Sequence, residues 1–235
     1  MKRRLQPSLS KRIPFFIRKY IGKLAEFLPE KRGLNVLVRR SKKLEDRYVG
    51  NAFMFSEKEI KKILNYKSST KFQDLTKNYY KDLEGFDDVS KMQYIDLNFW
   101  LVGDILLKAD KMSMANSLEV RVPFLDKEVF EIGKKIPTKY KVDNKETKKI
   151  FREISSKVLE DKVSKKEKLG FPVPIRVWLK EEDIYLKVKK EFENNKFFNE
   201  KGIIKLLDDH KLSKKDNSRK IWTLYTFLIW YKKFF

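Results

Sequence analysis

Apolar residues recur along most of the chain at the three- and four-residue spacing of helices. Capping-box patterns at residues 56–59 and 143–146 predict helices that run to about Asn65 and about Leu159. Residues 216–218 offer caps for the last helix. These signals predict a mainly helical protein.

Residues 90–115 read as one or two long helices, whereas the stretches 116–125, 134–143 and 161–174 read as loops. Strand-like alternation of apolar and polar residues is weak everywhere except at Leu34–Val38. We therefore expect little sheet from these residues.

The segment Phe99–Leu107 places apolar side chains in nearly every direction when drawn on a helix at 100° per residue, which predicts a buried helix. Asp104 and Asp110 would then lie where an ionised carboxylate needs a partner. Asp104 can pair with Lys108, four residues on. Asp110 points elsewhere and needs another partner.

Glu119, Arg121 and Asp126 follow this helix, and Pro123 ends any helical continuation. The residues by themselves favour a structural ion network at a helix end. A functional interpretation stays open, because perturbed carboxylates also gather at active sites.

Two other apolar stretches could suggest a membrane. Residues 13–28 form a basic amphipathic helix that could lie on a lipid surface, although packing in a core is favoured. Ile221–Tyr231 is too short to span a bilayer and reads as a buried helix. We expect no membrane association and no secretion signal.

His210 is the only histidine, and the chain has no cysteine, so a zinc site is not expected and no metal ligands are assigned. His210 reads as a capping or packing group. Tyr48, beside Arg47, reads as structural. The tryptophans read as core residues; they are Trp100, Trp178, Trp222 and Trp230.

The net charge of +22 raises the possibility of nucleic-acid binding. Half of the excess lies in residues 1–47, and lysine far outnumbers arginine, which weakens that interpretation. A basic nucleic-acid-binding module remains a minor alternative. The length of 235 residues favours one domain, and the lack of cysteine fits a reducing, cytoplasmic location.

The run Asp104–Asp126, DILLKADKMSMANSLEVRVPFLD, closely resembles a segment of the synthetase domain of glutamine-hydrolysing asparagine synthetases. Further blocks resemble the same family in the same order: LEDRYVGNAFMFSEKEIKKIL, KMQYIDLNFW, EKLGFPVPIRVWL and the stretch from residue 197 to 234. The resemblance covers residues 35–235, after a basic amphipathic segment at 1–34. Val102 and Gly103 depart from it, since the family has Pro-Asp there.

The resemblance implies the carboxyl-terminal part of an α/β synthetase domain of the ATP-pyrophosphatase type. Such a domain uses ATP and Mg²⁺ to adenylate aspartate, which ammonia then converts to asparagine. The implied partners are aspartate and ATP. Relatives that close β-lactam rings or macrocycles activate carboxylates in the same way, so the substrate stays open.

By the same resemblance, Lys168, Glu119 and Asp110 are the catalytic candidates, with Arg121 and Lys108 near the cofactor. Lys168 belongs to a Lys-x-Gly-Phe pattern whose lysine stabilises charge on the departing pyrophosphate. Two prolines beside Gly170 would stiffen this loop. A solvated surface lysine is the alternative.

Two parts of the family pattern are not found in these 235 residues. Without cysteine there is no thiolate to hydrolyse glutamine, so no glutaminase domain is expected. The eight glycines are never adjacent, and no Gly-rich loop could cradle a triphosphate. We expect a partial domain lacking most of its nucleotide-binding sheet, inactive alone. It would be a truncated gene, a fragment, or half of a split enzyme completed by a separate chain; an interaction scaffold is the alternative.

Overall fold

The computed structural model describes residues 14–27, 41–51, 53–143, 146–167, 170 and 173–235. Within these ranges the chain is almost entirely helices and turns, and extended pairing is limited to two isolated bridges. The prediction of a mainly helical protein is confirmed. The predicted strand Leu34–Val38 lies outside the described residues.

The chain divides into two compact units. The first unit comprises residues 1–52 and 72–168, and the second comprises residues 53–71 and 169–235. The helices of the first unit are α2 (Phe15–Phe27), η2 (Phe72–Leu75), α5 (Lys77–Lys81), α6 (Asp88–Ile95), η3 (Asp96–Leu106), α7 (Leu107–Met114), η4 (Pro123–Leu125), α8 (Lys127–Lys135), α9 (Thr138–Lys141), α10 (Lys149–Val158) and α11 (Asp161–Ser164). Those of the second are α4 (Glu57–Ile63), α12 (Ile175–Trp178), α13 (Glu182–Glu193), α14 (Glu200–Lys211) and α15 (Ser218–Phe234).

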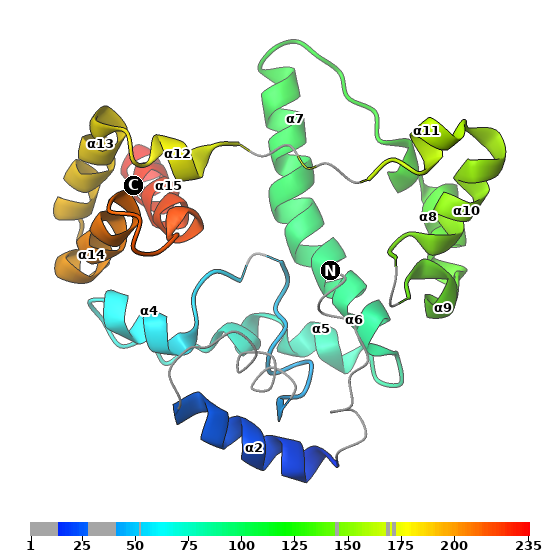
Figure 1. Cartoon of the computed structure of the whole chain (residues 1–235), viewed down its shortest axis with the longest axis horizontal. Helices are drawn as coiled ribbons and strands as arrows, with labels where there is room; N and C mark the ends of the chain where they lie inside the picture. The colour runs from blue at the N-terminus through cyan, green and yellow to red at the C-terminus, as the bar shows by residue number, and fades with distance from the viewer. Residues whose placement is uncertain (1–13, 28–40, 52, 144–145, 168–169, 171–172) are drawn as a thin grey trace. The chain divides into compact units, whose positions relative to one another are not determined.

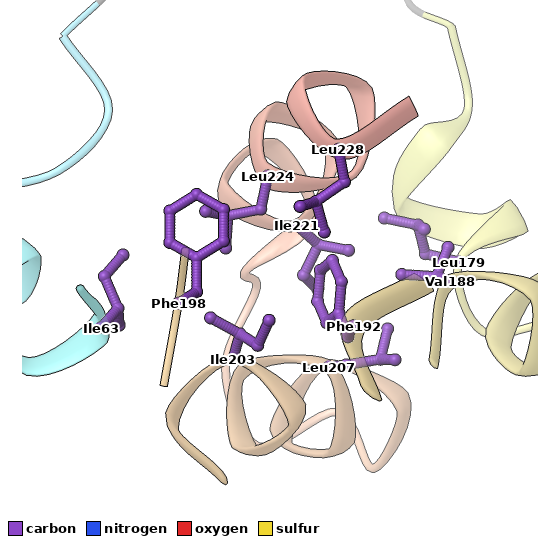
Figure 2. Close-up of a cluster of buried hydrophobic side chains, with 10 residues drawn as sticks. All are labelled: Ile63, Leu179, Val188, Phe192, Phe198, Ile203, Leu207, Ile221, Leu224 and Leu228. Carbon is purple, nitrogen blue, oxygen red and sulfur yellow. The ribbon is translucent and has the colours of Figure 1, made fainter. Parts of the chain in front are cut away.

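The second unit is built around a well-buried core. Apolar residues at helical spacing on α13, α14 and α15 turn toward one another, and Ile63 of α4 joins them (Figure 2). Phe192, Ile203, Leu207 and Ile221 are fully excluded from solvent. Burial of these side chains is the main force holding the five helices together.

The start of α4 is set by a local capping signal, and its end is set by contacts with a distant segment. The capping box predicted at Ser56 and Glu59 is present, with each residue bonding the other's backbone. The helix ends at Ile63, before the predicted Asn65. Asn65 instead takes a backbone bond of 2.9 Å from its N–H to the carbonyl of Phe197, and its side chain donates to the carbonyl of Phe198.

The last helix starts where its caps predicted. The Asp216 carboxylate accepts hydrogen bonds from the backbone N–H and the hydroxyl of Ser218, at 3.1 and 2.7 Å. One face of α15 is buried through Ile221, Leu224 and Leu228. The prediction of a wholly buried helix was therefore too broad.

The helix predicted to open at residues 143–146 begins later, at Lys149. Asp143 does accept the backbone N–H of Glu146, but in a turn whose ends are bridged by Val142 and Thr147. Lys148 has a φ of 58°, a left-handed conformation that interrupts a right-handed helix. The predicted loops at 134–143 and 161–174 likewise contain the short helices α9 and α11.

The first unit has a smaller core centred on α6. Leu44, Tyr80, Leu83, Met92 and Ile95 pack together with Tyr48. Just beyond α6, the Asp96 carboxylate accepts the Tyr48 hydroxyl at 2.6 Å.

Asp96 also binds Asn51, accepting its backbone N–H at 3.1 Å and its side-chain amide at 2.7 Å. Tyr80 donates to the carbonyl of Tyr48 at 2.7 Å, and burial raises the pKa of Tyr80. The structural role predicted for Tyr48 agrees with these contacts.

Two predictions of burial are not met. On α2, the apolar residues predicted to pack are exposed: Phe16, Ile17, Tyr20, Ile21 and Leu24. All four tryptophans expose at least 36% of their surface. None of these residues belongs to either of the two hydrophobic cores or packs against one. In the part of the chain that the structure describes, none of the helices combines the length and the apolar content of a transmembrane span.

A matched pair of leucines tests the core of the second unit. We expect Leu207→Ala, at a fully buried position on α14, to lower the free energy of unfolding by about 2–5 kcal/mol because it leaves a cavity. Leu186→Ala on α13, where the side chain is 52% exposed, should cost less than about 1 kcal/mol. Urea unfolding measures both, and equal losses would contradict this core.

A second prediction concerns the ion pair that joins α4 to α15, between Glu59 and Lys220. Partial burial by itself would raise the pKa of Glu59, but hydrogen bonds from Lys220 and Ser56 outweigh it and lower this pKa. The stabilisation is therefore complete above the unfolded-state pKa and is lost as pH falls through the lower folded value.

We expect Glu59→Gln, which keeps an acceptor for the Ser56 backbone, to lower stability at neutral pH and to flatten the acid loss below about pH 4. Unfolding free energies from pH 3 to 7 provide the measurement. A parallel pH profile for the wild type and the variant would refute the role of this pair.

Candidate functional site

The candidate residues lie on and just after one continuous helix of the first unit, formed by α6, η3 and α7. Residues Asp96–Leu106 adopt the wider π-helical form. Such segments are rare and occur mostly as single turns, frequently at functional sites. The sequence predicted one or two long helices over residues 90–115, and the structure has one, although its middle is not an ordinary α-helix.

Asp104 pairs with Lys108 as predicted, with 3.3 Å between Oδ1 and Nζ. Its other oxygen accepts the Trp100 indole N–H at 3.0 Å. The spacing of four residues on each side brings both donors to one carboxylate. The sequence interpretation missed Trp100 as a partner because it assigned this side chain to a core.

The prediction that Phe99–Leu107 is a buried helix is wrong for this structure. Between residues 96 and 178, no described residue is buried. The carboxylates of this helix are therefore solvated, and the Asp104–Lys108 pair contributes little to stability. Phe99, at the start of the segment, packs against the first-unit core and the Tyr79 ring, whereas Val102 and Leu107 are exposed.

Asp110 lies one turn further along α7 and is exposed. Its backbone carbonyl accepts the Ser113 hydroxyl at 3.1 Å. Among the described residues its carboxylate forms no ion pair. The sequence predicted that the Asp110 carboxylate would have a partner, and the described residues do not provide a charged one.

Helix α7 ends in a Schellman motif. Ser117 has a φ of 55°, the backbone N–H of Leu118 bonds the carbonyl of Ser113, and that of Ser117 bonds the carbonyl of Met114. This turn directs the chain into the loop that carries Glu119 and Arg121.

Glu119 and Arg121 form an ion pair, with side chains 69% and 86% exposed. The structure thus brings together two of the predicted site residues. Asp126 does not join them, because its carboxylate caps α8 by accepting the N–H groups of Glu128 and Val129. Its role is structural.

Lys168, the lysine assigned to pyrophosphate, lies outside the described residues. Nearby, Lys165 pairs with Asp161 at 2.6 Å. No group of three or more acidic, histidine or cysteine residues in the described ranges could hold a metal ion.

The segment that carries Asp110, Glu119 and Arg121 also exposes many apolar side chains. We call these side chains the 102–124 surface; its members are Val102, Leu107, Met112, Met114, Leu118, Val120, Val122 and Phe124, each between 47% and 63% exposed. So many exposed apolar side chains within one segment indicate a place where something else packs.

His210, predicted to be a capping or packing group, is buried in the second unit. Its Nε2 lies 3.0 Å from the carbonyl oxygen of Arg176, and its Nδ1 lies 3.4 Å from the backbone nitrogen of Asn217. Both ring nitrogens are occupied by backbone, which supports the packing role.

Comparison with known proteins gives a consistent result. The model of the family "Asparagine synthase" matches residues 5–232. The chain is 44% identical over 224 residues to "Asparagine synthetase [glutamine-hydrolyzing] 1" of Bacillus subtilis (strain 168), covering 94% of this chain and 35% of that protein. It is 39% identical over 228 residues to putative glutamine-hydrolysing asparagine synthetases of Mycobacterium bovis and Mycobacterium tuberculosis, with the same coverage.

The chain thus spans about a third of the length of these curated relatives. No solved structure matches it. The match nevertheless extends over nearly the whole chain and overlaps every block on which the resemblance was based. The chain belongs to the asparagine synthase family.

Proposed function

We propose that this chain contributes the carboxyl-side part of a synthetase domain that activates the side-chain carboxylate of aspartate with ATP for amidation to asparagine. It acts together with the portion of family members that it does not span, on the same or a separate polypeptide. The observation that carries the proposal is the family match over residues 5–232, with the candidate residues inside it.

The residue types suit this task. Lys108 and Arg121 are cations on an exposed helix and the loop that follows it, and each is paired with a carboxylate that an anionic ligand could replace. Adenylation needs positive charge on the leaving phosphates more than covalent help. Lys168 is assigned to that charge, Glu119 orients Arg121, and Asp110 is assigned to ordering Lys168 or polar groups of the substrate.

The N–H groups of Lys108 and Arg121 can bind phosphate oxygens but not a metal ion. Since the described residues contain no cluster that could hold a cation, Mg²⁺ would be held by the phosphates and by residues outside the described ranges. The ion would neutralise charge on the phosphates. The chain's own residues would bind and orient the anionic groups.

The 102–124 surface supports the need for a covering partner. Eight exposed apolar side chains flank the candidate residues, and transferring such surface out of water is favourable by roughly 25 cal/mol per Å². We assign the covering layer to the remaining two-thirds of a family member's length. Covering would also exclude water from the ion pairs and strengthen their electrostatic effect.

Reconstitution tests the activity. We expect no asparagine or pyrophosphate from the purified chain with ATP, Mg²⁺, aspartate and ammonia, and formation of both when the amino-side two-thirds of the Bacillus subtilis relative is added. Lys168→Met should lower kcat at least about 100-fold by removing charge stabilisation. Lys157→Met, at an exposed position on α10, is the matched control. Full activity of the lone chain, or equal rates for both variants, would refute the proposal.

Docking is measured separately. Leu118→Ser should weaken binding of the amino-side portion about tenfold or more, because an apolar contact is lost from the interface. Since Leu118 is 59% exposed in this chain, the variant should keep the wild-type melting temperature. Leu186→Ser, at a similarly exposed position in the second unit, provides the control. Analytical ultracentrifugation gives both affinities, and an equal effect of the two would exclude the 102–124 surface as the docking site.

A further inference from the structure

A cavity of about 480 Å³ lies wholly within the second unit, between α12 with the residues just after it and the turn that joins α14 to α15. This volume is in the range of small-molecule sites, roughly 300–1,000 Å³. Its charged and hydroxyl-bearing lining comprises Arg176, Lys180, Glu181, Ser213, Lys215 and Asp216.

Two side-chain ties hold the opposite walls of this cavity in place. The buried His210 ring spans them, because its Nε2 donates to the Arg176 carbonyl on one wall and its Nδ1 accepts the Asn217 N–H on the other. A carbonyl can only accept, so the Nε2 position carries the proton. Lys180 adds the second tie by donating to the Ser213 hydroxyl at 2.8 Å.

The turn itself is well determined by backbone bonds. Ser213 has a φ of 59°, and the N–H groups of Lys214 and Lys215 both bond the carbonyl of Asp209. The cavity is therefore a built feature of the unit. A site whose walls are already fixed loses less entropy when a ligand binds.

The charge of the lining favours an anion. Three cationic side chains face two carboxylates, and one of these, Asp216, already accepts two hydrogen bonds from Ser218. Those bonds lower the pKa of Asp216, so it stays committed to the start of α15. Lys180 keeps two further N–H donors beyond its bond to Ser213.

We propose that this cavity binds a phosphate group, with Arg176 as a two-pronged donor and Lys180 as a fixed point charge. A guanidinium matches a tetrahedral oxyanion through paired N–H donors, and an ammonium adds charge without demanding a direction. The ligand is inorganic phosphate or a small phosphate monoester. The site is independent of the proposed synthetase function.

Calorimetric titration of the full chain with inorganic phosphate tests the proposal. We expect saturable binding with a Kd in the range of about 1 mM, weakened at least about tenfold by Arg176→Gln and by Lys180→Met. Arg176→Lys should have a smaller effect because it keeps the charge. The phosphate affinity of Ser213→Ala should lie between those of Lys180→Met and the wild type, because this change removes only the hydrogen bond that positions Lys180.

Lys201→Gln removes one charge from an exposed position on α14 and should leave the affinity unchanged. Lys168→Met should also leave it unchanged, which distinguishes this site from the proposed synthetase site. Glycerol phosphate replaces inorganic phosphate in a second titration; tighter binding identifies an ester as the ligand, and equal binding identifies free phosphate.

Absence of saturable binding, equal weakening in Lys201→Gln, or equal affinity for acetate would overturn the assignment. Far-UV circular dichroism and melting temperatures establish that each variant is folded. If Arg176→Gln unfolds the chain, Arg176→Lys and Ser213→Ala still test the proposal. Wild-type phosphate affinity in both variants would contradict the proposed contacts.

Discussion

Among the described residues, most buried apolar side chains gather in two hydrophobic clusters; none between residues 96 and 178 is buried, although Phe99 and Ile175 pack against the edges of the clusters. This constraint governs the rest of the structure. Helices in proteins derive most of their stability from packing an apolar face. The helices between residues 96 and 178 have little of this packing within the chain, because their side chains are exposed or only partly buried. Their apolar side chains remain available to another layer of protein.

The two clusters differ in how they are reinforced. In the second unit, core packing is joined by the Glu59–Lys220 pair and by the hydrogen bonds of Asn65 to the Phe197–Phe198 segment. In the first, a single carboxylate, Asp96, gathers the loop at residues 48–51 onto the base of the long helix. The helix that carries the candidate residues is thus anchored at one end and exposed along the remainder.

This arrangement fits the family relationship. The chain corresponds to about a third of its curated relatives, and the part of it that bears the candidate residues is also the part that lacks buried side chains. A catalytic carboxylate or lysine needs a dry, pre-organised environment to act strongly. Exposed pairs such as Glu119 with Arg121 lack that environment in the chain described here. Covering the 102–124 surface would supply it.

Many local features of this protein can be predicted from its sequence alone. The helical spacing, the capping box at Ser56 and Glu59, the cap at Asp216 and the pair of Asp104 with Lys108 all depend on neighbours within four residues, so sequence suffices to specify them. The family blocks were readable for the same reason. The burial of side chains could not be predicted in this way, because whether an apolar face is covered depends on segments distant in the sequence.

Tertiary structure therefore decided that the tryptophans stay partly exposed, that α4 ends at Ile63, and that His210 joins two walls of a cavity. It also decided that Asp96, which the sequence did not single out, binds Tyr48 and Asn51 and so ties the long helix to the loop at residues 48–51. Each of these depends on contacts between residues far apart in the chain. Periodicity reveals that a helix has an apolar face, but only the packed structure establishes what lies against it.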